Sequence, residues 1–225
     1  MRTRARVLLP QVLLTLLSIV QALALELLWT RMTESDHLFP GAGAPDGAAV
    51  AALAGWLQFA AIALGIVLVW LVYVGLVLRF EWVPHTRDSI FPFAIGLLEF
   101  LAIEITGPAH PALWLAAMGV IFGVATYATN DVFVRALRES SLPFDEGASS
   151  AAADFRAALG LAGIHFLLAA VVWIDGGFGL LEAVVFAAVV AMILVQTWRV
   201  HGYLAGSLAE PDEPDEASAD EAEGE

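Results

Sequence analysis

Five carboxylates and one histidine lie inside, or at the ends of, long apolar stretches of this sequence. The carboxylates are Glu26, Glu99, Glu104, Asp175 and Glu182, and the histidine is His165. A charged side chain at the centre of a bilayer costs at least about 2.5 kcal/mol, so each of these groups needs a partner, a polar cavity or a neutral protonation state. Because buried acids and histidines carry protons or bind cations in membrane proteins, ion transport is the first chemistry that these residues suggest.

Glu99 and His165 are the best matched of these groups in depth. Glu99 is the acid nearest the middle of its apolar stretch, and His165 is the histidine nearest the middle of a later one. Glu104 and Glu182 lie closer to the ends of theirs. Glu104 is five residues from Glu99, about 140° around a helix, so these two do not form one carboxylate pair. Two interpretations are open: a proton or cation path, or plain hydrogen bonds between helices.

A line of polar residues runs along the first apolar stretch. At 3.6 residues per turn they fall within an arc of about 140°: Gln11, Thr15, Ser18, Gln21 and Glu26. Such a face should meet other helices or water rather than lipid. It predicts either an interhelical hydrogen-bonding surface or the lining of a hydrated path to Glu26.

Small residues also mark the fourth apolar stretch, where Gly119 and Gly123 form a GxxxG motif. This motif permits close helix contact, either inside the bundle or between protomers. Enzyme motifs such as GxSxG, HExxH, the phosphate loop and the dinucleotide fingerprint are absent from the sequence. There is no cysteine, and the five histidines are scattered, so the sequence predicts no metal site, no cofactor and no catalytic role.

These residues are positioned by six stretches that are apolar and long enough to cross about 30 Å of hydrocarbon. The predicted spans are residues 7–30, 49–80, 89–106, 111–129, 155–173 and 178–200. Proline and glycine punctuate the breaks between them. The fold class expected is therefore an all-α integral membrane protein, with a membrane domain over residues 1–207.

Arginine counting gives the orientation. With the N-terminus inside, nine arginines fall on the cytoplasmic side and only Arg31 falls outside. The sequence thus predicts both termini in the cytoplasm of a multi-pass cell-membrane protein. The alternative is that the first stretch is a cleaved signal, because Ala22-Leu23-Ala24 resembles a cleavage site.

The composition of the 225 residues supports a membrane protein, with 60% hydrophobic and only 15% charged residues. The net charge of −14 is concentrated in the predicted tail, residues 208–225, which holds nine acids and no base. This tail is expected to be disordered and to repel nucleic acid, so the predicted partners are membrane lipid and other membrane proteins.

Two functions follow from these features. The first is a non-catalytic accessory or scaffolding subunit of a membrane assembly, in which the polar residues are structural and helix faces meet a partner protein or a second copy. The alternative is a small channel or transporter that moves protons or monovalent cations. In that case Glu99 would carry the ion, His165 and Glu182 would be its neighbours, and Glu26 would line the approach. Glu104 would belong to the same path at a separate level.

Overall fold

The computed structural model describes residues 2–79, 86–139 and 144–208, and these form a bundle of long helices. The helices are α1 (Arg2–Glu34), the short 3-10 helix η1 (Asp36–Leu38), α2 (Ala48–Arg79), α3 (Thr86–Glu104), α4 (Pro111–Glu139), α5 (Phe144–Asp175) and α6 (Leu180–Leu208). The described residues contain no β-strand. The all-helical prediction is therefore confirmed, whereas the predicted tail lies outside the described residues from residue 209 onwards.

Five of the helices are long and apolar enough to cross a membrane. These segments are Leu8–Glu34, Ala48–Leu78, Pro111–Arg135, Phe155–Asp175 and Leu180–Gly202. The predicted third span, residues 89–106, does form the helix α3, but α3 is only 19 residues long. It also carries Arg87, Asp88, Glu99 and Glu104, which lower its apolar character. The five apolar helices are thus compatible with a multi-pass membrane protein.

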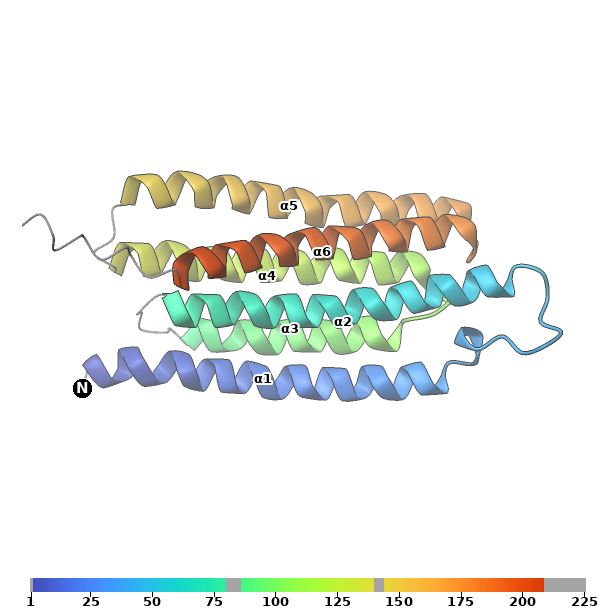
Figure 1. Ribbon diagram of the computed structural model, residues 1–225, viewed down its shortest axis with the longest axis horizontal. Coiled ribbons are helices and arrows are strands. Elements are labelled where there is room, and N and C mark those ends of the chain that lie inside the picture. Colours follow the sequence, from blue (N-terminus) through green and yellow to red (C-terminus); the bar gives the residue numbers. More distant parts are fainter. Residues whose placement is uncertain (1, 80–85, 140–143, 209–225) are drawn as a thin grey trace, which may run out of the picture.

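Neighbouring helices run along one another (Figure 1), and their contacts link them in a ring. On one side the order of contact is α1, α3, α4 and α5, and on the other it is α1, α2 and α6. The most extensive contacts are those of α4 with α5 and of α2 with α6. Consequently α3 lies between α1 and α4, where its polar residues can reach side chains of both neighbours.

Glycines end two of the helices. Gly107 (φ +120°) follows α3 and Gly176 (φ +67°) follows α5, both in the left-handed region that favours glycine. These positions fall in the Gly- and Pro-containing breaks of the sequence. The chain can therefore reverse direction within a few residues after each helix.

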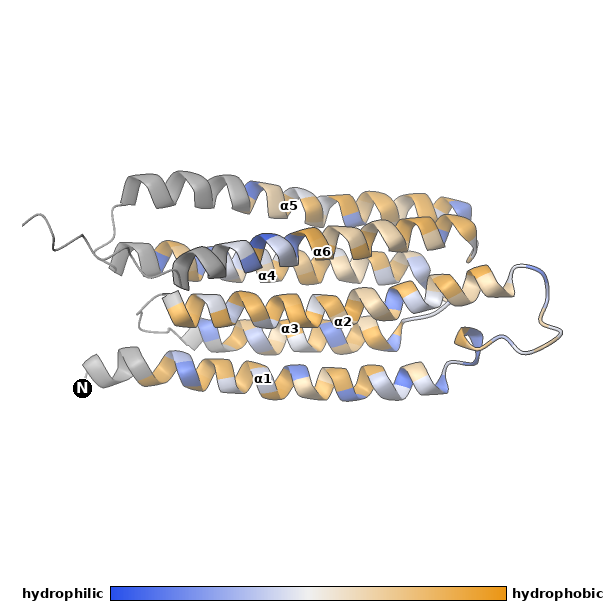
Figure 2. Cartoon of the chain, in the orientation of Figure 1, coloured by the Kyte–Doolittle hydropathy of each residue, from blue (hydrophilic) through white to orange (hydrophobic). Residues whose placement is uncertain are grey.

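The described parts of the helices are hydrophobic along most of their lengths, as the hydropathy colouring shows (Figure 2). Large apolar side chains such as Leu167, Trp173 and Trp198 are 69%, 78% and 76% exposed. The interior is packed with fully buried side chains that include Leu17, Ile95 and Trp114. Exposed apolar surface on this scale is costly in water but is stable against lipid.

Candidate functional site

The middle of the bundle contains a hydrogen bond between two buried polar side chains. Glu99 of α3 is 3% exposed and Gln21 of α1 is 4% exposed. The Nε2 of Gln21 donates to Oε1 of Glu99 at 3.2 Å. The helices approach closely here because Gly96, one turn before Glu99, has no side chain: a Cβ at this position would lie 2.1 Å from Cγ1 of Val20. The close approach of Val20 to Gly96 and the hydrogen bond of Gln21 to Glu99 therefore lie next to each other in the α1–α3 contact.

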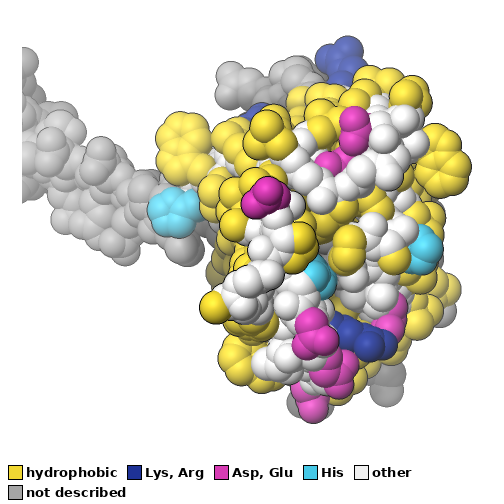
Figure 3. Space-filling model, turned by 90° about the vertical axis from the view of Figure 1, so that its right-hand side faces the viewer, with side chains coloured by type: hydrophobic (Ala, Val, Ile, Leu, Met, Phe, Trp, Pro, Cys, Tyr) yellow, Lys and Arg dark blue, Asp and Glu magenta, His cyan; other side chains and the backbone are white. Residues whose placement is uncertain are grey.

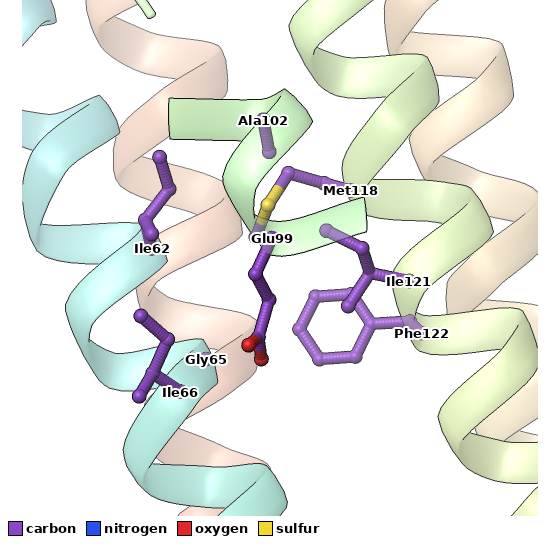
Figure 4. A pocket seen from close by; sticks show the side chains of 8 residues that line it. All are labelled: Ile62, Gly65, Ile66, Glu99, Ala102, Met118, Ile121 and Phe122. Carbon is purple, nitrogen blue, oxygen red and sulfur yellow. The ribbon is translucent and has the colours of Figure 1, made fainter. Parts of the chain in front are cut away.

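A small, mainly apolar cavity adjoins Glu99 (Figure 4). Its walls come from α2, α3 and α4 and consist of Ile62, Gly65, Ile66, Glu99, Ala102, Met118, Ile121 and Phe122. The space open to water is about 10 Å³, which is close to the minimum for one water molecule. Oε2 of Glu99 has no hydrogen-bond partner among the described residues, so one water is the most that this cavity can offer it.

His165 lies in α5 and is 2% exposed, but it does not form a hydrogen bond with Glu99. Its Nδ1 lies 2.8 Å from the carbonyl oxygen of Leu161. Because a carbonyl oxygen only accepts, Nδ1 carries the proton, and Nε2 has no partner among the described residues. The ring of Phe122 contacts the imidazole at a centroid distance of 5.1 Å and also lines the Glu99 cavity. The Phe122 ring thus packs against the predicted histidine and faces the same cavity as the predicted acid.

The GxxxG motif of α4 faces α5 within the same chain. A Cβ on Gly119 would lie 3.1 Å from Cβ of His165 and 3.2 Å from the carbonyl oxygen of Ala162. Gly123 is farther away, with Cβ of Ala162 at 4.0 Å. Close approach of α4 and α5 at Gly119 therefore fixes the position of His165 in the bundle.

Glu104, the last residue of α3, forms an ion pair with Arg31 of α1. Arg31 also lies 3.5 Å from Glu34 on its own helix. The side chains of Arg31 and Glu104 are 42% and 43% exposed, so this pair contributes little to stability. Figure 3 looks at this end of the bundle and shows acidic side chains beside a basic one. Glu104 does not line the Glu99 cavity.

An ion-pair cluster that sequence analysis did not single out lies at the opposite end of α3. The side chain of Asp88 is 0% exposed and receives two hydrogen bonds from the guanidinium of Arg135 on α4, one of them at 3.0 Å. Arg135 also contacts Asp131, one turn earlier on α4, at 2.9 Å. The spacing of Asp131 and Arg135 was the signal available in the sequence, but it does not reveal Asp88 as the partner.

The polar residues of α3 are thus connected to other helices at three levels. Asp88 is paired with α4 at one end, Glu99 is bonded to α1 in the middle, and Glu104 is paired with α1 at the other end. Polar side chains that bond across helices orient them in a membrane. These contacts explain how α3 packs into the bundle with three acidic side chains.

Glu182 has a local role at the start of α6. It is 1% exposed, and its Oε2 accepts a hydrogen bond from the backbone N–H of Gly179 at 2.7 Å. A glutamate in the first turn that bonds back to the residue before the helix is one half of a capping box. Its Oε1 has no partner among the described residues, and no described hydrogen bond joins Glu182 to Glu99.

A second buried polar cluster, which the sequence did not predict, lies at the end of the bundle that carries the Arg31–Glu104 pair. Gln58 of α2 is 0% exposed, and its Oε1 accepts from the N–H of Gly107 at 3.0 Å. His37 of η1 lies near Gly107, and its ring packs edge-to-face with that of Phe178 at a centroid distance of 6.3 Å. Burial lowers the pKa of His37, and the nearby charge of Asp36 opposes this shift. The single glutamine in a long apolar span was the only sequence signal.

The polar line of α1 divides between the interior and the outside of the bundle. Gln21 is buried, and the half-buried Ser18 accepts a hydrogen bond at 3.1 Å from the indole N–H of Trp70 on α2. Gln11, Thr15 and Glu26 are exposed. The hydroxyl of Thr15 donates only to the carbonyl of Gln11 in its own helix. The sequence predicts that the whole line faces helices or water; in the structure Gln21 and Ser18 face neighbouring helices, and the other three side chains point away from the bundle.

The described residues contain no group of three or more histidine, aspartate or glutamate side chains that could hold a metal ion. Comparison with protein-family models, curated proteins and solved structures finds no match to this chain. The fold and the site define a helical membrane-type protein in which three acids of α3 connect it to neighbouring helices.

Proposed function

We propose that this protein is a non-catalytic accessory or scaffolding subunit of a larger membrane assembly. The observation that carries the proposal is the outward direction of Gln11, Thr15 and Glu26 on α1. A carboxylate in hydrocarbon costs about 2.5 kcal/mol or more on insertion scales, with a smaller cost near the interface. A helix from another protein would cover this polar face and offset that cost.

We further propose that all six helices cross the membrane with both termini in the cytoplasm. α3 runs beside α1, α2 and α4, and its charged residues have partners on α1 and α4. An even number of crossings returns the chain to its starting side, and the arginine distribution favours the cytoplasm for that side. The same features support the cell membrane as the location.

The arrangement around Glu99 favours a structural role over transport. A path for protons or cations needs a chain of polar groups or waters across the membrane. Around Glu99 the described residues supply Gln21, a cavity for about one water, and the ring of Phe122. In the accessory role, Glu99 orients α3 against α1, which needs only the hydrogen bond to Gln21.

The test is the size and composition of the particle that contains this protein. The full chain is extracted from native membranes in a mild detergent and analysed by blue native electrophoresis and by light scattering. We expect a protein mass well above that of one 23.9 kDa chain, with a second polypeptide in constant ratio. A homogeneous single chain would contradict the proposal.

A flux assay supplies an independent arm. The purified chain and its Glu99→Gln variant are placed in liposomes under proton, sodium and potassium gradients. The accessory role predicts no flux above empty liposomes for either protein. Flux in the wild type that is lost in a folded Glu99→Gln variant would establish ion transport instead, with Glu99 as the essential group.

A further inference from the structure

One face of α1 points directly away from the bundle and carries polar and small side chains between large apolar ones such as Leu8 and Ile19. Glu26 is nine residues from the fully buried Leu17, and Thr15 is nine residues from the fully buried Ala24. Nine residues make about two and a half turns, so each pair projects in opposite directions. Gln11 and Ala22 are exposed on the same side. We call Gln11, Thr15, Ala22 and Glu26 the α1 outer face.

Glu26 lies inside the apolar segment and not at its end. The segment runs over Leu8–Glu34, and the ion pair of Arg31 with Glu104 lies towards its outer end. Glu26 is five residues before Arg31, which places it about 7.5 Å deeper along the helix. Among the described residues no side chain donates to its carboxylate. Ala22, one turn away, leaves room for the close approach of another helix.

We propose that the α1 outer face binds a transmembrane helix of a different protein, and that this helix places an arginine or lysine opposite Glu26. The inference rests on the proposed accessory function and specifies the partner. Charge complementarity is the reason: a carboxylate in an apolar medium is stabilised most strongly by a cationic donor. Gln11 and Thr15 would bond to polar side chains farther along the same partner helix.

A second copy of this chain is a poorer occupant of the face. Two copies with the same orientation would pack their α1 helices about a two-fold axis along the membrane normal. Glu26 would then meet Glu26 of the other copy, and like charges at short range disfavour that arrangement. Within the described side chains of α1 the only arginine is Arg31, which is already paired with Glu104.

The experiment uses the absence of cysteine from the chain, since a single introduced cysteine is unique. Ala22→Cys in the full chain is labelled with a photoreactive maleimide in native membranes, and the cross-linked peptides are sequenced. Leu167→Cys, at a 69% exposed apolar position of α5, is the matched control. We expect Ala22→Cys to capture an apolar segment of another protein that contains an arginine or lysine, and Leu167→Cys to capture lipid.

Variants of Glu26 test the charge. In the Ala22→Cys background, Glu26→Gln should lower the cross-linking yield roughly tenfold, and Glu26→Lys should abolish it. Because Glu26 is exposed, both variants should fold, and their thermal unfolding is measured as a check. A captured segment without a basic residue, or a yield that does not respond to Glu26→Lys, would overturn the inference.

The remaining outcomes separate this inference from the proposed function. Capture of α1 from another copy would replace the partner helix with a homodimer and overturn the inference. Lipid adducts alone from Ala22→Cys, beside an intact native complex, would overturn the inference and leave the accessory function in place. Lipid adducts together with a single-chain particle would overturn both.

Discussion

Adding one methyl group at Gly96 should loosen the contact between α1 and α3 that carries the Gln21–Glu99 hydrogen bond. The new Cβ would lie 2.1 Å from Cγ1 of Val20 and 3.6 Å from its Cβ. Valine in a helix has one strongly preferred rotamer, so Val20 cannot easily rotate away. Overpacking of this kind costs about 1–3 kcal/mol of unfolding free energy.

A matched control isolates the packing effect from helix propensity. Alanine is more favourable than glycine inside a helix by about 0.5–1 kcal/mol, and this gain applies at any helical position. Gly163 in α5 has nothing within 4 Å of an added Cβ, so Gly163→Ala should show the gain alone. The unfolding free energies of Gly96→Ala and Gly163→Ala should therefore differ by about 1–3 kcal/mol.

The measurement is reversible unfolding of the purified chain by SDS in mixed micelles, followed by circular dichroism. Combining Gly96→Ala with Val20→Ala removes the clash and should recover part of the lost stability. If Gly96→Ala stabilises the protein as much as Gly163→Ala does, α1 does not pack on Gly96, and the described environment of Glu99 is wrong. If Val20→Ala gives no recovery, the clash lies elsewhere.

Three further perturbations test other contacts. Gln21→Leu removes the donor to the buried Glu99 and should lower the unfolding free energy by about 1–3 kcal/mol in the same assay. Arg135→Met breaks the largely buried pair with Asp88 and should cost about 3 kcal/mol, whereas the double variant with Asp88→Asn should recover part of this loss. Burial lowers the pKa of His37 below its ordinary value of 6.5, so the folded state favours the neutral ring. The stability that the neutral His37 ring contributes is therefore fully present above pH 6.5 and is lost as the pH falls through its folded pKa. Hydrogen exchange at the N-terminal end of α2 should detect this loss in the wild type but not in His37→Gln.

Much of the helical fold follows from apolar length and from the glycine and proline breaks. The helix ends do not, because a helix continues through polar residues that keep its backbone bonds. The predicted spans at residues 111–129 and 155–173 lie within the longer helices Pro111–Glu139 and Phe144–Asp175. Apolar composition identifies the part of a helix suited to the membrane, while the helix itself extends beyond it.

The pairing of the polar groups could not be predicted in the same way. Both Gln21 and Glu99 were recognisable as polar residues in apolar stretches, but their contact depends on α1 lying beside α3. Depth alone matched Glu99 with His165, whereas the structure places the ring of Phe122 against His165 and in the wall of the Glu99 cavity. Asp88 and Gln58 belong to no sequence motif, so only the arrangement of the helices in the bundle reveals their partners.

The two helices that meet at Gln21 and Glu99 differ in whether their acidic side chains have partners on other helices. On α3, Asp88, Glu99 and Glu104 all have partners on neighbouring helices, including arginines at both ends. On α1, Glu26 points away from every neighbour that the described residues provide. Because an acid inside a membrane is stabilised by a partner, this difference supports the proposed partner helix opposite Glu26. The acids of α3 are paired inside the bundle, and this contrast with Glu26 is the reason for proposing an interface at the α1 outer face.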